Sequence, residues 1–172
     1  MIAKVYSVVV SWLDGQLVEV EVDIHNGMPA FIIVWLPDTA IQESRERVRS
    51  AIKNSDLPFP RTKITVNLAP ADIKKTGPSF DLPIALWILL EECSIDQNLL
   101  NQTLVIGELA LDGAVRSVQA VLPTVIYEKE KWYKRVIVPE ENAIEAALIP
   151  DVEIVPAKNI AEIVRMFSGA IP

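Results

Sequence analysis

Along residues 17–25, apolar and acidic side chains alternate with a period of two. Since successive side chains of a strand point to opposite faces, this alternation predicts a strand that buries one face and exposes the other. Shorter segments bounded by turn residues predict further strands over 4–11, 31–36, 63–69, 103–109, 114–118, 135–139 and 152–156. The run at 31–36 is apolar throughout, which is typical of a strand covered on both faces.

Apolar residues at helical spacing predict a helix from Thr39 to about Ser55, with Ile41, Val48 and Ile52 facing inward. Further helices are expected over 80–93, 120–132, 140–148 and 159–168. The first three strands read as antiparallel, whereas strands and helices alternate in the second half, which favours parallel pairs. We therefore expect one α/β domain over 1–172, an α+β two-layer sandwich with helices packed on a mixed sheet.

Composition supports a soluble domain with a sizeable core, because hydrophobic residues make up 51% of the 172 positions. No apolar run reaches the roughly 18 residues that a membrane span needs, and the N-terminus reads as a strand rather than a signal peptide. The single cysteine, Cys93, has no partner for an internal disulfide and suits a reducing compartment. A cytoplasmic location with no membrane segment is therefore expected.

Charge is unevenly distributed, although the formal net charge is −7. An acidic chain argues against a generic nucleic-acid binder, but residues 42–75 carry +4 and leave −11 for the rest. Basic side chains of this segment are candidates for contact with DNA phosphates: Arg45, Arg49, Lys53, Arg61, Lys63, Lys74 and Lys75. The alternative is a solvated helix face held by local pairs such as Glu43–Arg47 and Glu46–Arg49.

A Lys-Lys-Thr-Gly-Pro-Ser turn at 74–79 precedes the apolar helix and places Ser79 at its start. Unpaired backbone N–H groups and the positive end of the helix dipole suit a nucleophile with an oxyanion hole at this position. The same geometry suits a serine that only caps the helix. A nucleophile also needs a base, and the candidates are His25, before a predicted hairpin, or Lys74 and Lys75 by nearness in sequence.

Neither a metal nor a nucleotide cofactor is expected in this chain. One histidine and one cysteine leave only carboxylates as further metal ligands, and these read as exposed helix edges or a solvated strand face. The phosphate-binding patterns G-x-x-x-x-G-K-S/T and G-x-G-x-x-G are both absent from the sequence.

Several long motifs carry a family resemblance: LPDTAIQESRERVRSAIKNS, ITVNLAPAD, GPSFDLPIAL and GELALDG. Together they resemble the N-terminal domain of the Mg-chelatase-like ComM family of bacterial AAA+ ATPases, over essentially the whole chain. The resemblance implies a ribosomal protein S5 domain 2-like fold, shared with the proteolytic domain of Lon. It also implies that the AAA+ module, with its ATP and Mg, lies outside this chain. The intact family protein is similar to hexameric motors that act on DNA during natural transformation.

The proteolytic domain of Lon has a Gly-Pro-Ser turn with its nucleophile at the serine, which Ser79 matches. Its general-base lysine follows an element that resembles 107–113 here, and counting on places Leu122 at the lysine position. Because leucine cannot accept the serine proton, peptidase activity is not expected, and Ser79 is interpreted as a helix cap. Four residues stand at usual glycine positions of the family, where a positive φ would be strained: Trp35, Asp56, Trp87 and Ala120.

The leading hypothesis is a non-catalytic accessory domain of a Mg-chelatase-like AAA+ ATPase, which helps to assemble the motor or contacts DNA. The expected partners are the AAA+ domain of the same polypeptide, further copies in a hexamer, and DNA. Two alternatives stay open at this point, a peptidase that uses Ser79 and a purely structural interaction module.

Overall fold

The computed structural model describes residues 4–11, 14–34, 39–75, 77–131 and 133–169. The strands are β1 (Lys4–Ser11), β2 (Asp14–His25), β3 (Ala30–Val34), β4 (Lys63–Ala69), β5 (Thr103–Val105), β6 (Glu108–Leu109), β7 (Val115–Arg116), β8 (Arg135–Pro139) and β9 (Glu153–Ala157). The α-helices are α1 (Thr39–Asn54), α2 (Asp81–Glu92), α3 (Gln97–Leu100), α4 (Val121–Lys131), α5 (Ala143–Ala146) and α6 (Ile160–Phe167). Two 3-10 helices are η1 (Pro78–Phe80) and η2 (Glu140–Asn142).

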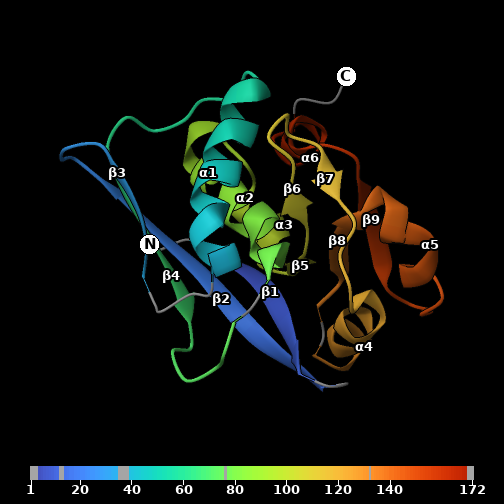
Figure 1. Ribbon diagram of the computed structural model, residues 1–172. Helices are drawn as coiled ribbons and strands as arrows, with labels where there is room; N and C mark the ends of the chain where they lie inside the picture. The colour runs from blue at the N-terminus through green and yellow to red at the C-terminus, as the bar shows by residue number, and fades with distance from the viewer. Residues whose placement is uncertain (1–3, 12–13, 35–38, 76, 132, 170–172) are drawn as a thin grey trace.

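Seven strands form one mixed sheet in the order β3-β4-β2-β1-β5-β8-β9 (Figure 1). The β1–β2 and β2–β4 pairs are antiparallel, whereas β3–β4, β1–β5, β5–β8 and β8–β9 are parallel. Strands β6 and β7 form a separate two-stranded sheet. The predicted α/β class with a mixed sheet is therefore confirmed, and so are the parallel pairs of the second half.

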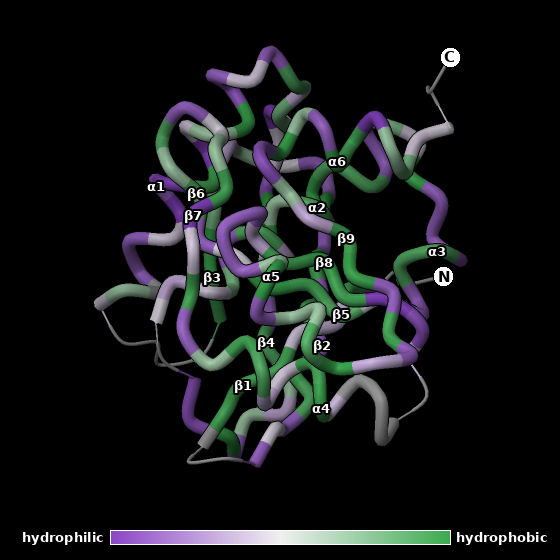
Figure 2. The backbone as a smooth tube through the Cα atoms, turned by 90° about the vertical axis from the view of Figure 1, so that its right-hand side faces the viewer, coloured by the Kyte–Doolittle hydropathy of each residue, from purple (hydrophilic) through white to green (hydrophobic). Residues whose placement is uncertain are grey.

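Helices lie on both faces of the central strands, so three layers are present there rather than the two that the sequence predicted. In β8, Ile137 belongs to the apolar cluster under α1, α2 and α6, while Val136 and Val138 belong to the cluster under α4 and α5. Successive strand residues point to opposite faces, so the two clusters are the two sides of the sheet. From Asp81 to Leu90, every residue of α2 is buried. Figure 2 shows this apolar centre as the green segments of α2, β5 and β8.

Strand β3 differs from the prediction in its neighbours and its burial. The expected hairpin after His25 does not pair β3 with β2, because β4 lies between them. The expectation that β3 is covered on both faces is also wrong, since Ile32 and Val34 remain 41% and 46% exposed. Strand β3 is at the sheet edge, and from this strand only Phe31 and Ile33 belong to the apolar cluster under α1 and α2.

The predicted strand 103–109 is interrupted where the chain leaves the large sheet. A Cβ atom on Gly107 would lie 2.9 Å from Val115 Cγ1 and 3.0 Å from Leu82 Cδ2, so glycine permits a close approach here. The Leu82 amide donates to the Gly107 carbonyl at 3.1 Å. Glycine at this position therefore lets the start of α2 pack directly on the turn between β5 and β6.

Two of the four unusual residues at family glycine positions have positive φ. Asp56 follows α1 at φ 55°, and Ala120 precedes α4 at φ 61°. Both angles lie in the left-handed region, which costs more for Ala than for Asp, so the condition stated for strain is met at these positions. Trp87 instead packs in the core within α2, while Trp35 lies outside the described residues.

Candidate functional site

Ser79 lies inside the 3-10 helix η1 and caps no helix. Gly77 has φ 83° and precedes η1, while α2 begins at Asp81 with Phe80 as its cap residue. Neither helix receives a side-chain cap hydrogen bond, so the interpretation of Ser79 as a cap is wrong. Because Pro78 starts an extra 3-10 turn, Ser79 is displaced from the cap position, and its carbonyl instead accepts from Gly107 N at 3.1 Å.

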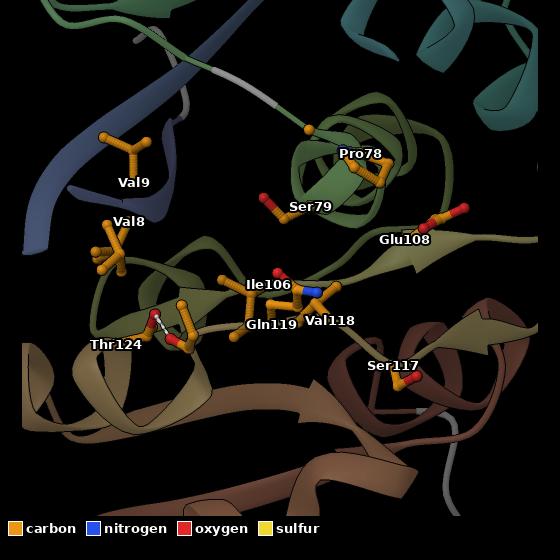
Figure 3. A pocket seen from close by; sticks show the side chains of 13 residues that line it. Val8, Val9, Pro78, Ser79, Ile106, Glu108, Ser117, Val118, Gln119 and Thr124 are labelled. Atoms are coloured by element: carbon orange, nitrogen blue, oxygen red, sulfur yellow. Dashed lines mark hydrogen bonds between the residues drawn. The ribbon is translucent and has the colours of Figure 1, made fainter. Parts of the chain in front are cut away.

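A pocket of about 590 Å³ lies in front of this serine. Its walls are Val8–Val10 of β1, residues 77–79, Ile106 and Glu108, residues 117–120, and Thr124. In Figure 3 the Ser79 hydroxyl points into the space between β1 and Ile106. No hydrogen bond joins the Ser79 hydroxyl to a described residue. The pocket is therefore a mixed cavity with a serine hydroxyl available to a ligand.

The rim of the pocket is held by a buried amide. Asn142 accepts a hydrogen bond from Val118 N at 3.0 Å and donates one to Val118 O at 3.1 Å. On the next turn, Thr124 Oγ1 donates to the Ala120 carbonyl at 3.0 Å, drawn as the dashed line in Figure 3. These bonds fix the left-handed turn at Ala120 where it borders the pocket.

No described histidine or lysine lines this pocket, in which Glu108 is the one ionisable side chain. His25 lies at the end of β2, where Nδ1 is 3.0 Å from the Asp23 carboxylate. Leu122 lies in the first turn of α4 and is not part of the cavity wall. The described residues therefore place no amine or imidazole base in the pocket of Ser79.

Lys75 is a buried residue rather than a base or a surface cation. Its side chain is 2% exposed, and Nζ donates to the carbonyls of Pro70 and Ile73, the latter at 2.9 Å. Burial lowers the pKa of Lys75, with the Asp72 charge acting in the opposite direction. This amine thus holds the loop before Ser79 together.

A buried ion pair below the turn was not predicted from the sequence. Asp81 accepts bonds from Arg47 Nε at 2.6 Å, Arg47 Nη2 at 3.2 Å and Leu109 N at 3.2 Å, and also from the Ser44 hydroxyl. Burial raises the pKa of the Asp81 carboxyl, although the Arg47 and Ser44 hydrogen bonds act against this. Hydrogen bonding to Asp81 raises the pKa of Arg47. One carboxylate therefore connects α1, α2 and β6.

Three of the predicted basic residues lie along one side of α1. Arg49 and Lys53 have their charged groups 5.8 and 5.9 Å from the Phe59 ring centroid. Arg45 Nη1 lies 3.5 Å from the Phe31 carbonyl oxygen of β3. We call Arg45, Arg49 and Lys53 the basic side of α1. The Arg49 and Lys53 cations lie near the Phe59 ring, which restricts the motion of these side chains while leaving their charge at the surface.

Lys63 and Lys75, two of the other four predicted basic residues, do not join this surface. Lys63 points to the sheet face opposite α1, because its neighbour Ile64 is in the cluster beneath that helix. Arg61 is exposed before β4, and Lys74 is exposed after it. Lys75 is buried, so the seven candidates do not form one surface.

The described part of the chain contains no group of three or more His, Cys, Asp or Glu side chains suited to hold a metal ion. Within the same residues, no helix has the length and apolar character needed to cross a bilayer.

Comparison with known proteins places the domain in a class. Residues 20–142 match the family described as subunit ChlI of Mg-chelatase, and the chain belongs to this Mg-chelatase-like family of AAA+ ATPases. It is 39% identical over 168 residues to the competence protein ComM of Haemophilus influenzae, covering 98% of this chain and 33% of that protein. It is 43% identical over 132 residues to the uncharacterized protein YifB of Escherichia coli, covering 77% of this chain and 26% of YifB.

A more distant similarity concerns the fold. The chain is 28% identical over 125 residues to the archaeal Lon protease of Methanocaldococcus jannaschii, covering 69% of this chain and 19% of that protease. Together with the mixed sheet, this similarity fits the Lon-like fold predicted from the motifs. The chain spans about a third or less of the length of these curated relatives.

Proposed function

We propose that this chain is a non-catalytic, cytoplasmic accessory domain of a Mg-chelatase-like AAA+ ATPase, and that it contacts DNA through the basic side of α1. The observation that carries the proposal is the row of Arg45, Arg49 and Lys53 on one helix side. Membership of the family and the similarity to a competence protein support a role in DNA processing during transformation. ATP, Mg and the contacts of a hexamer belong to the motor module in this proposal.

The geometry of the basic side suits a phosphate backbone. Residues four apart on a helix lie about 5–6 Å from each other, so three cations follow roughly two turns of α1. Such contacts recognise charge rather than base sequence, because phosphates are common to all sequences. We therefore expect binding that is insensitive to DNA sequence and weakens steeply with salt.

Fluorescence anisotropy with labelled single- and double-stranded DNA at low salt tests the proposal. The double variant Arg45→Glu with Arg49→Glu should bind DNA at least about tenfold more weakly. The slope of log K, with K the association constant, against log salt concentration should also become shallower. The expected change is about 0.9 for each duplex phosphate that the variant no longer neutralises. Lys158→Glu with Arg165→Glu is a matched control, because it changes the net charge equally at exposed positions elsewhere. Equal weakening in the two double variants would show only a net-charge effect and refute the basic side as the DNA-binding surface.

A second candidate function, peptide hydrolysis, rests on the Ser79 hydroxyl that faces the pocket. It requires a general base, and the one ionisable side chain of the described lining is the Glu108 carboxylate. A serine-directed fluorophosphonate probe should leave the folded chain unlabelled if the accessory role is correct. Labelling that disappears in Ser79→Ala would instead support the peptidase. If the chain neither binds DNA nor reacts with the probe, the structural interaction module is the function that remains.

A further inference from the structure

Strands β1 and β5 separate just after they meet. On one edge, β1 pairs with β2 from Lys4 to Ser11, but on its other edge it pairs with β5 only at Tyr6 and Leu104. Beyond β5, Ile106 N donates to Ile137 O and Gly107 N donates to Ser79 O, so the chain turns away from β1. Among the described residues, no strand pairs with this edge of β1 over Val8–Val10.

This unpaired edge forms one wall of the Ser79 pocket. Val8–Val10 line the cavity on one side, and the 77–79 turn lines it on the other. Figure 3 shows Val8 and Val9 across an open space from Ser79. An exposed strand edge presents N–H and C=O groups that accept another strand, and pairing in a sheet requires only backbone groups from the added chain.

We propose that the pocket binds an extended peptide segment, which pairs with the free edge of β1 and lies between β1 and Ser79. The cavity of about 590 Å³ has the size of a typical ligand pocket. At about 3.3 Å per residue, the edge from Val8 to Val10 accommodates three or four peptide residues. This proposal does not depend on DNA contact by α1, which lies outside the pocket.

The lining defines the chemistry of the peptide. Val8 and Ile106 are apolar walls, so small apolar side chains suit the positions that face them. The Ser79 hydroxyl both donates and accepts, and it is available to a peptide amide. Glu108 is the single ionisable group of the described lining and favours a basic residue at its end of the pocket. We expect binding without bond cleavage, because the described lining contains no lysine or histidine beside Ser79.

Titration of ¹⁵N-labelled protein with the blocked peptide acetyl-Lys-Val-Ala-Val-amide tests the proposal by NMR. The largest chemical-shift changes of backbone amides on peptide binding should occur at residues 8–10, at Ser79 and at 118–120. A twin peptide, N-methylated at alternate residues, keeps the side chains but lacks those backbone donors, and it should bind at least about tenfold more weakly. Equal affinity of the twin would overturn strand addition, and the absence of binding at millimolar peptide would overturn the peptide site.

Two variants distinguish peptide binding in the pocket from nonspecific binding elsewhere on the domain. Ser79→Leu fills the cavity and should reduce peptide affinity at least about tenfold, whereas Ala147→Leu adds similar bulk at an exposed position outside the pocket and should leave it unchanged. If both variants bind like the native chain, the pocket is not the site. The N-methyl comparison uses the native chain and therefore stands even if Ser79→Leu fails to fold. Peptide recovered intact by mass spectrometry is expected, and cleaved peptide would overturn a binding-only role.

Discussion

Substitution of Asp81 by asparagine should destabilise the domain through the buried ion pair with Arg47. The change keeps the side-chain shape but removes the charge that two guanidinium nitrogens share at 2.6 and 3.2 Å. Removing one partner from a buried pair costs about 3–5 kcal/mol, because the other charge is left unpaired. The Arg47 side chain keeps 17% exposure and a 3.6 Å ion pair with Glu43, which relieve part of that penalty, so we expect the lower end, about 3 kcal/mol.

Urea unfolding followed by circular dichroism measures this destabilisation, which corresponds to a fall in Tm of roughly 6–12 °C for a domain of this size. A double-mutant cycle with Arg47→Met isolates the pair, and the double variant should recover part of the stability. Glu153→Gln is the control, since Glu153 binds Arg135 at 2.9 Å but is 54% exposed, and such pairs contribute about 0–1 kcal/mol. A destabilisation below about 1 kcal/mol for Asp81→Asn, or no coupling in the cycle, would refute the reasoning.

Three further substitutions test individual features of the fold. Ala120→Gly should stabilise the chain by about 0.5–1 kcal/mol in urea unfolding. The free energy gained by relieving the φ of 61° exceeds the cost of the greater unfolded-state entropy of glycine. A decrease in stability would contradict the left-handed turn. Gly107→Ala should destabilise the domain by about 1–3 kcal/mol, because the added Cβ would lie 2.9 Å from Val115. Gly27→Ala is the control and should have little effect, because its Cβ would lie 3.6 Å from the nearest side chain. Similar losses of stability in the two variants would contradict the close approach at Gly107. Lys75→Met should cost about 1–3 kcal/mol by leaving two carbonyls without their donor. Since burial lowers the folded-state pKa of Lys75, native stability should rise with pH between that pKa and the unfolded value of 10.5, a slope absent from Lys75→Met.

Local periodicity in the sequence predicted most elements because it reports which side of an element is buried. The strand predicted at 135–139 corresponds to β8 with the same limits, and the alternation at 17–25 lies within β2. The same periodicity could not reveal which strands are neighbours. Residues 31–36 therefore read as a doubly covered strand, although β3 lies at an edge that only the long-range pairing with β4 defines.

The candidate site was predictable only where it depends on one element. Helical spacing alone brought Arg45, Arg49 and Lys53 together on α1. The pairing of Arg47 with Asp81 joins residues 34 positions apart in sequence, so no local pattern signalled it. Asp81 carries one signal that was missed, since a carboxylate at the start of a strongly apolar, buried helix requires a partner. The pocket was not predicted because segments far apart in the sequence, from β1 to Thr124 of α4, build it.

The central position of β1 has a consequence for synthesis of the protein. Leu104 of β5, the partner of β1 on its second edge, is synthesised about a hundred residues after Tyr6. At about 5–20 residues per second, β1 of the nascent chain lacks its Leu104 partner at Tyr6 for roughly 5–20 s. Ribosome-bound chaperones are therefore expected to engage the first half of this chain before the sheet closes.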